Sequence, residues 1–256
     1  MIMHGRAIAP GTAEGEALVL DEPFSFLGGA DGATGDLHVR TGNLAGKVFV
    51  FPKGKGSTVG SFVMYDLKVH GKAPAAVVNQ TAETIVTTGA VIASIPMADQ
   101  VDVSLIREGD RVIVDGKRGY VELPDVQVLD SASSVILTAG KVLMLCRPPA
   151  ARSFPGVWSL VSGRVERGET PEETARREIK EETGLTVGFP DAVLPPVLVR
   201  EGNTVWRVWP FLFRAEQAKP VLNRENTAFQ WVAPAEVSER PTVAKVPDII
   251  KLFIGQ

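Results

Sequence analysis

An acidic segment offers the most specific chemistry in the sequence. Six glutamates lie between Glu169 and Glu182. Glu178 and Glu182 are four residues apart and Glu181 is three from Glu178, so a helix would bring the three carboxylates to one face. Hard divalent cations such as Mg²⁺ prefer carboxylate oxygens, which makes the segment a candidate metal site. The alternative is a solvated helix with ordinary ion pairs, such as that of Arg177 with Glu181.

The flanking residues predict where this helix begins and ends. Pro171 is tolerated in a first turn, and the two glutamates that follow it complement the positive end of the helix dipole. Gly184 is a typical helix stop. Ala175 and Ile179 would then point toward a core.

The spacing of the segment is more specific than its charge. It runs Gly163, five residues, Glu169, seven residues, Arg177-Glu178-Ile179, one residue, Glu181-Glu182, one residue and Gly184-Leu185. This pattern resembles the full signature of the Nudix hydrolases. The resemblance implies an α/β/α sandwich that cleaves a diphosphate linkage in a nucleoside-diphosphate-type or other small organic diphosphate. It also implies Mg²⁺ as cofactor, with Mn²⁺ as a substitute.

The resemblance implies roles for individual residues. Cleaving a diphosphate requires an in-line water and stabilised charge on nonbridging oxygens, and carboxylate-held cations serve both needs. The expected metal-binding residues are Gly163 (through its carbonyl), Glu169, Glu178, Glu181 and Glu182. Arg177 would orient a glutamate, so the expected catalytic residues include Arg177 beside Glu178 and Glu182. Glu225 is a candidate general base, with an exposed loop glutamate as the alternative.

The substrate-binding residues are less specific. Arg147 and Trp158 are expected to contact the substrate. Trp206, Trp209 and Phe211 could also stack on a base, although aromatic residues in strands more often belong to a core. Many family members carry Pro-Gly-Gly before the signature, whereas this chain has Val-Ser-Gly at 161–163, so the substrate subclass stays open.

Length and charge limit the remaining possibilities. The chain has 256 residues, 45% of them apolar, and a net charge of −3. The length favours two domains, which we place at 1–127 and 128–256. Acidic and basic residues are mixed in both halves, so we expect a small-molecule substrate and no nucleic acid polymer as partner.

The single cysteine and the hydropathy pattern indicate in which cellular compartment the protein is expected. Cys146 is the only cysteine, which excludes an intramolecular disulfide and an iron-sulfur cluster held by thiolates of this chain alone. The start lacks a basic segment followed by an apolar core, and no stretch approaches the roughly 18 apolar residues that span a bilayer. We therefore expect a cytoplasmic protein that does not enter the membrane.

The first half contains short β-type runs between turn residues. The runs are EALVL, GKVFVF, AAVVN, ETIVTTGAVIASI and DRVIVDGKRGYVEL. One helix is expected, at roughly 58–70, with Ser57 as its N-cap, an apolar face that includes Phe62, and Gly71 as its stop. The polar stretch LPDVQVLDSASS breaks the strand pattern, and a hairpin turned at Ala139-Gly140 follows it. The fold class is therefore a β-rich first domain and an α/β second domain.

A glycine-rich loop precedes that first helix. The Gly-Lys-Gly-Ser sequence at 54–57 could bind an anion through backbone N–H groups and Lys55, although its spacing is not that of a Walker loop. Residues 4–125 as a whole resemble the aconitase X swivel domain, the small-subunit module of phosphomevalonate dehydratase and relatives. The resemblance implies a swivelling β/β/α barrel-like domain that closes over an aconitase-like large subunit. It assigns substrate contact to Lys55, Gly56 and Ser57, with Ser57 also active in proton transfer.

Three functions remain in competition. The chain could be a diphosphate hydrolase with a swivel domain attached, or a dehydratase small subunit with an accessory Nudix domain. In the third, the first half is a non-catalytic scaffold, for example in a homo-oligomer. The loop with Gly28-Gly29 and Asp31 is a weaker candidate for substrate contact, and His4, His38 and His70 are too scattered for a metal site.

Overall fold

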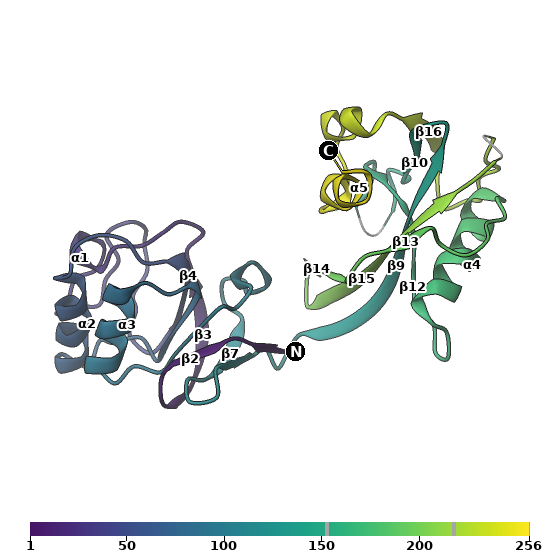
Figure 1. Cartoon of the computed structure of the whole chain (residues 1–256). Helices are drawn as coiled ribbons and strands as arrows, with labels where there is room; N and C mark the ends of the chain where they lie inside the picture. Colours follow the sequence, from purple (N-terminus) through teal and green to yellow (C-terminus); the bar gives the residue numbers. More distant parts are fainter. Residues whose placement is uncertain (152–153, 217–218, 256) are drawn as a thin grey trace. The chain divides into compact units, whose positions relative to one another are not determined.

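The chain folds into two compact units, Met1–Gln127 and Val128–Gln256, in the computed structural model (Figure 1). The structure describes residues 1–151, 154–216 and 219–255. Each unit is described by itself below. Within the described ranges, no helix combines the length and the apolar character needed to cross a membrane.

The first unit is built on a mixed eight-stranded sheet. Its strands are β1 (Ile2–His4), β2 (Arg6–Ala9), β3 (Thr12–Val19), β4 (Val48–Lys53), β5 (Ala76–Thr81), β6 (Met97–Asp99), β7 (Arg111–Asp115) and β8 (Tyr120–Glu122). They lie in the order β1-β8-β7-β3-β4-β5-β6-β2, and β3 to β6 run parallel to one another while the other neighbours are antiparallel. Parallel neighbours need crossover connections, and these supply the helices.

Four short helical segments belong to this unit: α1 (Phe26–Gly29), α2 (Gly60–Val69), α3 (Thr84–Ile92) and the 3₁₀ helix η1 (Val103–Leu105). The run ETIVTTGAVIASI, expected as a strand, forms α3 instead. The side chain of Glu83 accepts the Ile85 and Val86 N–H groups and so caps this helix. Gly89 lies against Met64 of α2. Capping and helix-helix packing therefore outweigh the strand preference of the β-branched residues.

Helix α2 also differs from its prediction. It begins at Gly60, and Ser57 is not its N-cap, because the Ser57 Oγ accepts the Val59 N–H (3.3 Å) in a turn before the helix. The end is as expected, since Gly71 follows the last turn with φ of 65°. Phe62 does not face the core and is 67% exposed, whereas Leu67 is buried.

The second unit is an α/β/α sandwich. Its strands are β9 (Gln127–Thr138), β10 (Lys141–Cys146), β11 (Trp158–Ser159), β12 (Val161–Arg164), β13 (Ala192–Val193), β14 (Val197–Glu201), β15 (Thr204–Arg214) and β16 (Ala228–Val232). Its helices are α4 (Pro171–Thr183), α5 (Val246–Ile254) and the 3₁₀ helix η2 (Pro234–Glu239). Ala175 and Ile179 of α4 pack on one face of the sheet, and Val246 and Ile249 pack on the other.

Strand β9 corrects one expectation and confirms another. The polar stretch at 130–134 is not a break, because it continues the strand and pairs with β12. Within this stretch, Asp130 accepts hydrogen bonds from both Arg207 (2.6 Å) and Trp209 (2.9 Å). The expected hairpin is confirmed, since Ala139 and Gly140 both have positive φ between β9 and β10.

Candidate active site

Helix α4 is fixed at both ends by residues of the acidic segment. Thr170 and Glu173 form a capping box at its start, and Gly184 ends it with φ of 67°. Ala175 and Ile179 are buried, as the sequence predicts. The glutamates of the opposite side therefore stand in a defined orientation over strand β12, which α4 contacts.

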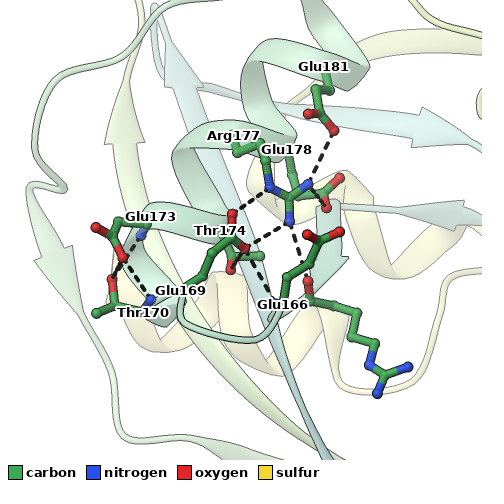
Figure 2. A network of polar contacts seen from close by, with 9 residues as sticks. Glu166, Glu169, Thr170, Glu173, Thr174, Arg177, Glu178 and Glu181 are labelled. Carbon is green, nitrogen blue, oxygen red and sulfur yellow. Dashed lines mark hydrogen bonds and ion pairs between the residues drawn. The ribbon is translucent and has the colours of Figure 1, made fainter.

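Arg177 connects three glutamates and one backbone carbonyl around this helix (Figure 2). Its guanidinium donates to Glu169 (2.9 Å), Glu178 (2.7 Å) and Glu181 (3.2 Å), and to the Arg164 carbonyl (3.4 Å). The bonds from Arg177 and from the Thr174 hydroxyl lower the pKa of Glu169 to about 2. Glu169 therefore stays ionised and holds Arg177 in place.

Glu178 lies directly against Gly163. A Cβ at position 163 would stand 1.9 Å from the Glu178 Oε1, so only glycine leaves room for this carboxylate. Burial raises the pKa of Glu178 despite its bond to Arg177, and repulsion from Glu181 and Glu225 adds to the rise.

Glu182 is the most buried acidic group of α4. Its Oε1 accepts the Ser162 N–H (3.2 Å) and its Oε2 accepts the Asn226 amide (2.6 Å). Burial raises its pKa to about 7, helped by repulsion from Glu178 and Glu225 and opposed by the two hydrogen bonds. Such a carboxylate gains stability from a nearby cation.

The donors suit a hard divalent cation. The carboxylates of Glu178 and Glu182 reach the neighbouring residues Gly163 and Ser162, and Glu225 acts electrostatically on both. Within the described ranges, no three acidic, histidine or cysteine side chains already converge on one metal position. The carboxylates have other partners instead. Arg177 forms ion pairs with Glu178 and Glu181, and the Asn226 amide donates a hydrogen bond to Glu182. The fit therefore rests on the donor types and on the space beside Gly163.

A cavity of about 230 Å³ begins at the same glycine. Gly163 and Arg164 line it on β12, and Trp206 lines it on β15. Of the residues expected to contact substrate in this unit, Arg147 lines the cavity. Trp158 does not belong to its described lining, and Arg240 lies over the Trp158 ring at 5.7 Å from the centroid.

The glycine-rich loop of the first unit adjoins the segment that precedes α1. The Lys55 N–H donates to the Phe24 carbonyl (2.9 Å), and a side chain at Gly56, whose φ is 104°, would meet the Ser25 hydroxyl. Lys55 and Ser57 are exposed. The structure thus groups the predicted residues of this loop on one exposed edge.

The other candidates of this unit have structural contacts. Asp31 accepts the Ala33 and Thr34 N–H groups in a turn, and these bonds lower its pKa. His38 contacts the Gly28 carbonyl, whereas His70 pairs with Asp66 on α2.

Comparison with known proteins assigns both halves. Residues 2–123 match the family model of the aconitase X swivel domain, and residues 128–253 match that of the NUDIX domain. The phosphomevalonate dehydratase small subunit of Thermococcus onnurineus is 52% identical over 130 residues, which are 49% of this chain and 100% of that protein. The chain belongs to the aconitase X swivel family, and its second half carries a NUDIX domain.

Solved structures resemble each half separately. The swivel half is similar to aconitase X from Thermococcus kodakaraensis, with 51% identity, a TM-score of 0.47, and coverage of 48% of this chain and 98% of that chain. The Nudix half is similar to the MutT protein from Methanosarcina mazei, with 25% identity, a TM-score of 0.45, and coverage of 50% and 94%.

Two residues of the Nudix half, Asn226 and Glu201, were not predicted from the sequence. Asn226 follows Glu225 directly, yet it is Asn226 that is buried and bonded to Glu182. Glu201 lines the cavity and accepts the Trp206 indole N–H (3.1 Å). Side chains alternate between the two faces along the strands on both sides of the Gly202-Asn203 turn, and this alternation could have placed Glu201 on the face that the valines share.

Proposed function

We propose that the Nudix domain is a divalent-metal-dependent pyrophosphohydrolase that cleaves the diphosphate linkage of a nucleoside-diphosphate-type or other small organic diphosphate. The observation that supports it most is the approach of the Glu178 and Glu182 carboxylates to Ser162 and Gly163, where the cavity begins. Diphosphate bound there would have its charged part beside the glutamates and its remaining part in the cavity.

Each residue then has a defined task. Glu178, Glu182 and the Gly163 carbonyl would hold Mg²⁺ or Mn²⁺, with Glu181 at the exposed side. The bound ion would offset phosphate charge and activate water. Glu169 holds Arg177, and Arg177 orients Glu178 and Glu181. Glu225, which acts electrostatically on Glu178 and Glu182, is the candidate proton acceptor.

The hydrolase is tested with a panel of diphosphates and Mg²⁺. Phosphate or nucleoside monophosphate release is followed for the natural chain and for Glu178→Gln, which keeps the side-chain shape and removes the charge. We expect at least a 10³-fold loss of kcat/KM, on the order of the several kcal/mol that a bound metal supplies. Glu239→Gln, exposed and outside the cavity lining, is the matched control. Equal rates for Glu178→Gln and the natural chain would eliminate the proposal.

A second candidate function concerns the swivel domain. The T. onnurineus relative is named a small subunit, and this chain covers it completely. Next to the Ser57 loop, α2 and the residue before it expose four apolar side chains at helical spacing, namely Val59 (47%), Phe62 (67%), Tyr65 (49%) and Val69 (62%). A row of this kind fits a hydrophobic protein interface. We propose that the swivel domain pairs with an aconitase-like large subunit through this apolar row.

The pairing predicts a selective effect of Phe62→Glu. A charge in the centre of an apolar interface should lower co-purification with a dehydratase large subunit at least 10-fold, because the carboxylate would be desolvated without a partner. Ile2→Glu, on the edge strand β1 and 54% exposed, is the control. Unchanged association of Phe62→Glu would refute the docking face, and a change in self-association instead would favour a homo-oligomer.

A further inference from the structure

The cavity of the Nudix domain has a floor and walls of different chemistry. Its floor carries serine hydroxyls of β9, β11 and β12, among them Ser133 and Ser159. Its walls are apolar, from Val199 and Val208 of the β14–β15 hairpin and Val246 and Ile249 of α5. A flat ring with polar edges suits such a mixed lining, because its faces can pack on the valines and its edges can hydrogen-bond, which a hydrocarbon chain cannot do.

The hairpin register brings one charged group into this apolar wall. Val199 pairs with Trp206, Glu201 with Thr204, and Val197 with Val208. Residues directly opposite each other in an antiparallel pair share a face, so Glu201 and Trp206 belong to the same face as the valines. The turn at Gly202 (φ 55°) fixes this register.

The Glu201 carboxylate is held in place. Its Oε2 accepts the Trp206 indole N–H at 3.1 Å, and both residues are partly buried. Its Oε1 has no hydrogen-bond partner among the residues that the structure describes. An indole donor bonded to one oxygen limits rotation of the carboxylate and leaves acceptor capacity on both oxygens. Glu201 can therefore receive two parallel N–H donors from a ligand.

We propose that the cavity binds a guanine ring and that Glu201 is the specificity-determining residue that reads it. Guanine alone among the common bases presents two adjacent donors, a ring N–H and an amino group, on one edge, which matches the two oxygens of a carboxylate. Adenine and cytosine place a ring acceptor beside their amino group, and this acceptor would face the negative charge. The inference rests on the proposed function for its substrate, which becomes a guanosine diphosphate derivative.

The position of Gly163 supports this placement of the substrate. Gly163 belongs to the lining of the cavity and also lies against Glu178. Arg147 lines the same cavity. A nucleotide whose base contacts Glu201 would thus direct its phosphates toward the acidic site beside Gly163.

Binding of nucleoside monophosphates tests the inference without any turnover. Calorimetry is performed on the full chain with GMP, IMP and AMP in the presence of a chelator. IMP lacks only the amino group, so we expect GMP to bind about 10- to 100-fold more tightly than IMP, the effect of one hydrogen bond to a charged acceptor. AMP should bind more weakly than IMP. Equal affinity for GMP and IMP, or no GMP binding at millimolar concentration, overturns the inference.

Glu201→Gln identifies the group that discriminates. The amide replaces one acceptor with a donor, so the ratio of GMP to IMP affinity should fall to about one, and AMP should bind as well as before or better. Glu239→Gln should keep the natural ratio. A ratio that survives Glu201→Gln overturns the assignment, and the melting temperature of the variant shows whether it is folded.

Hydrolysis assays keep the two proposals separate. Preference for GMP that depends on Glu201, together with no hydrolysis of any diphosphate, would support the guanine site and refute the hydrolase. Hydrolysis of diphosphates that depends on Glu178 but has the same kcat/KM whatever the base would support the hydrolase and refute the guanine site.

Discussion

Replacing Glu182 by glutamine should abolish hydrolysis and, at the same time, stabilise the metal-free protein above pH 7. The loss of activity, at least 10³-fold, is expected because the change removes the charge of a buried carboxylate that we propose as a metal ligand. The gain in stability follows from burial, because Glu182 is 5% exposed and its pKa is raised to about 7. A neutral glutamine can still accept the Ser162 N–H, and the Asn226 amide can turn to accept from it.

The direction of the pH dependence is fixed by the raised pKa. The folded chain binds a proton at Glu182 more tightly than the unfolded chain, whose glutamate has its ordinary pKa near 4.5. This contribution to stability is fully present below about pH 4.5 and is lost as the pH rises through about 7. At pH 8 the natural chain therefore carries a cost on the order of 3 kcal/mol that Glu182→Gln lacks.

Calorimetric melting in a chelator checks the effect. At pH 8 we expect the Nudix transition of Glu182→Gln about 10 °C above that of the natural chain, and at pH 5 a difference of less than half as much. Mg²⁺ should raise the transition of the natural chain and leave that of the variant unchanged. Glu166→Gln, an exposed residue before α4, is the control. An equal shift at both pH values would contradict the assignment of this pKa.

Local sequence signals predicted the acidic site but not its partners. The helix α4 follows from Pro171, Gly184 and the spacing of its apolar residues, all of which act within a few turns. The bond between Glu182 and Asn226 joins residues 44 positions apart, and no periodicity carries that information. Because the two residues meet only after the chain has folded, Asn226 could not be singled out beside Glu225.

Capping and tertiary contacts explain two of the differences from prediction in the swivel domain. The residues of α3 favour a strand by type, but the Glu83 cap and the close approach of Gly89 to Met64 select a helix. In α2, Phe62 was expected on the apolar face because it is hydrophobic and lies at helical spacing from Leu67. Its exposure depends on which face of the helix the sheet covers, and that choice is made by the packing of Leu67 and Met64.

Gly163→Ala should remove activity while leaving the fold intact. The backbone of Gly163 does not have a positive φ, so alanine is tolerated conformationally. Its Cβ would stand 1.9 Å from the Glu178 Oε1 and 2.4 Å from the Cγ, and the flexible glutamate must move away. We expect kcat/KM to fall about 10²- to 10³-fold, because the proposed metal ligand Glu178, displaced by an ångström or more, would no longer meet the required geometry.

A matched control and a double variant make this prediction strict. Gly188→Ala adds the same methyl group where nothing lies within 4 Å, and it should have natural activity. Because Gly163→Ala acts through Glu178, the double variant with Glu178→Gln should be no slower than Glu178→Gln alone. Melting temperatures within about 3 °C of the natural chain would show that the loss is local. Full activity of Gly163→Ala would mean that the Glu178 carboxylate functions in a position other than the space beside Gly163.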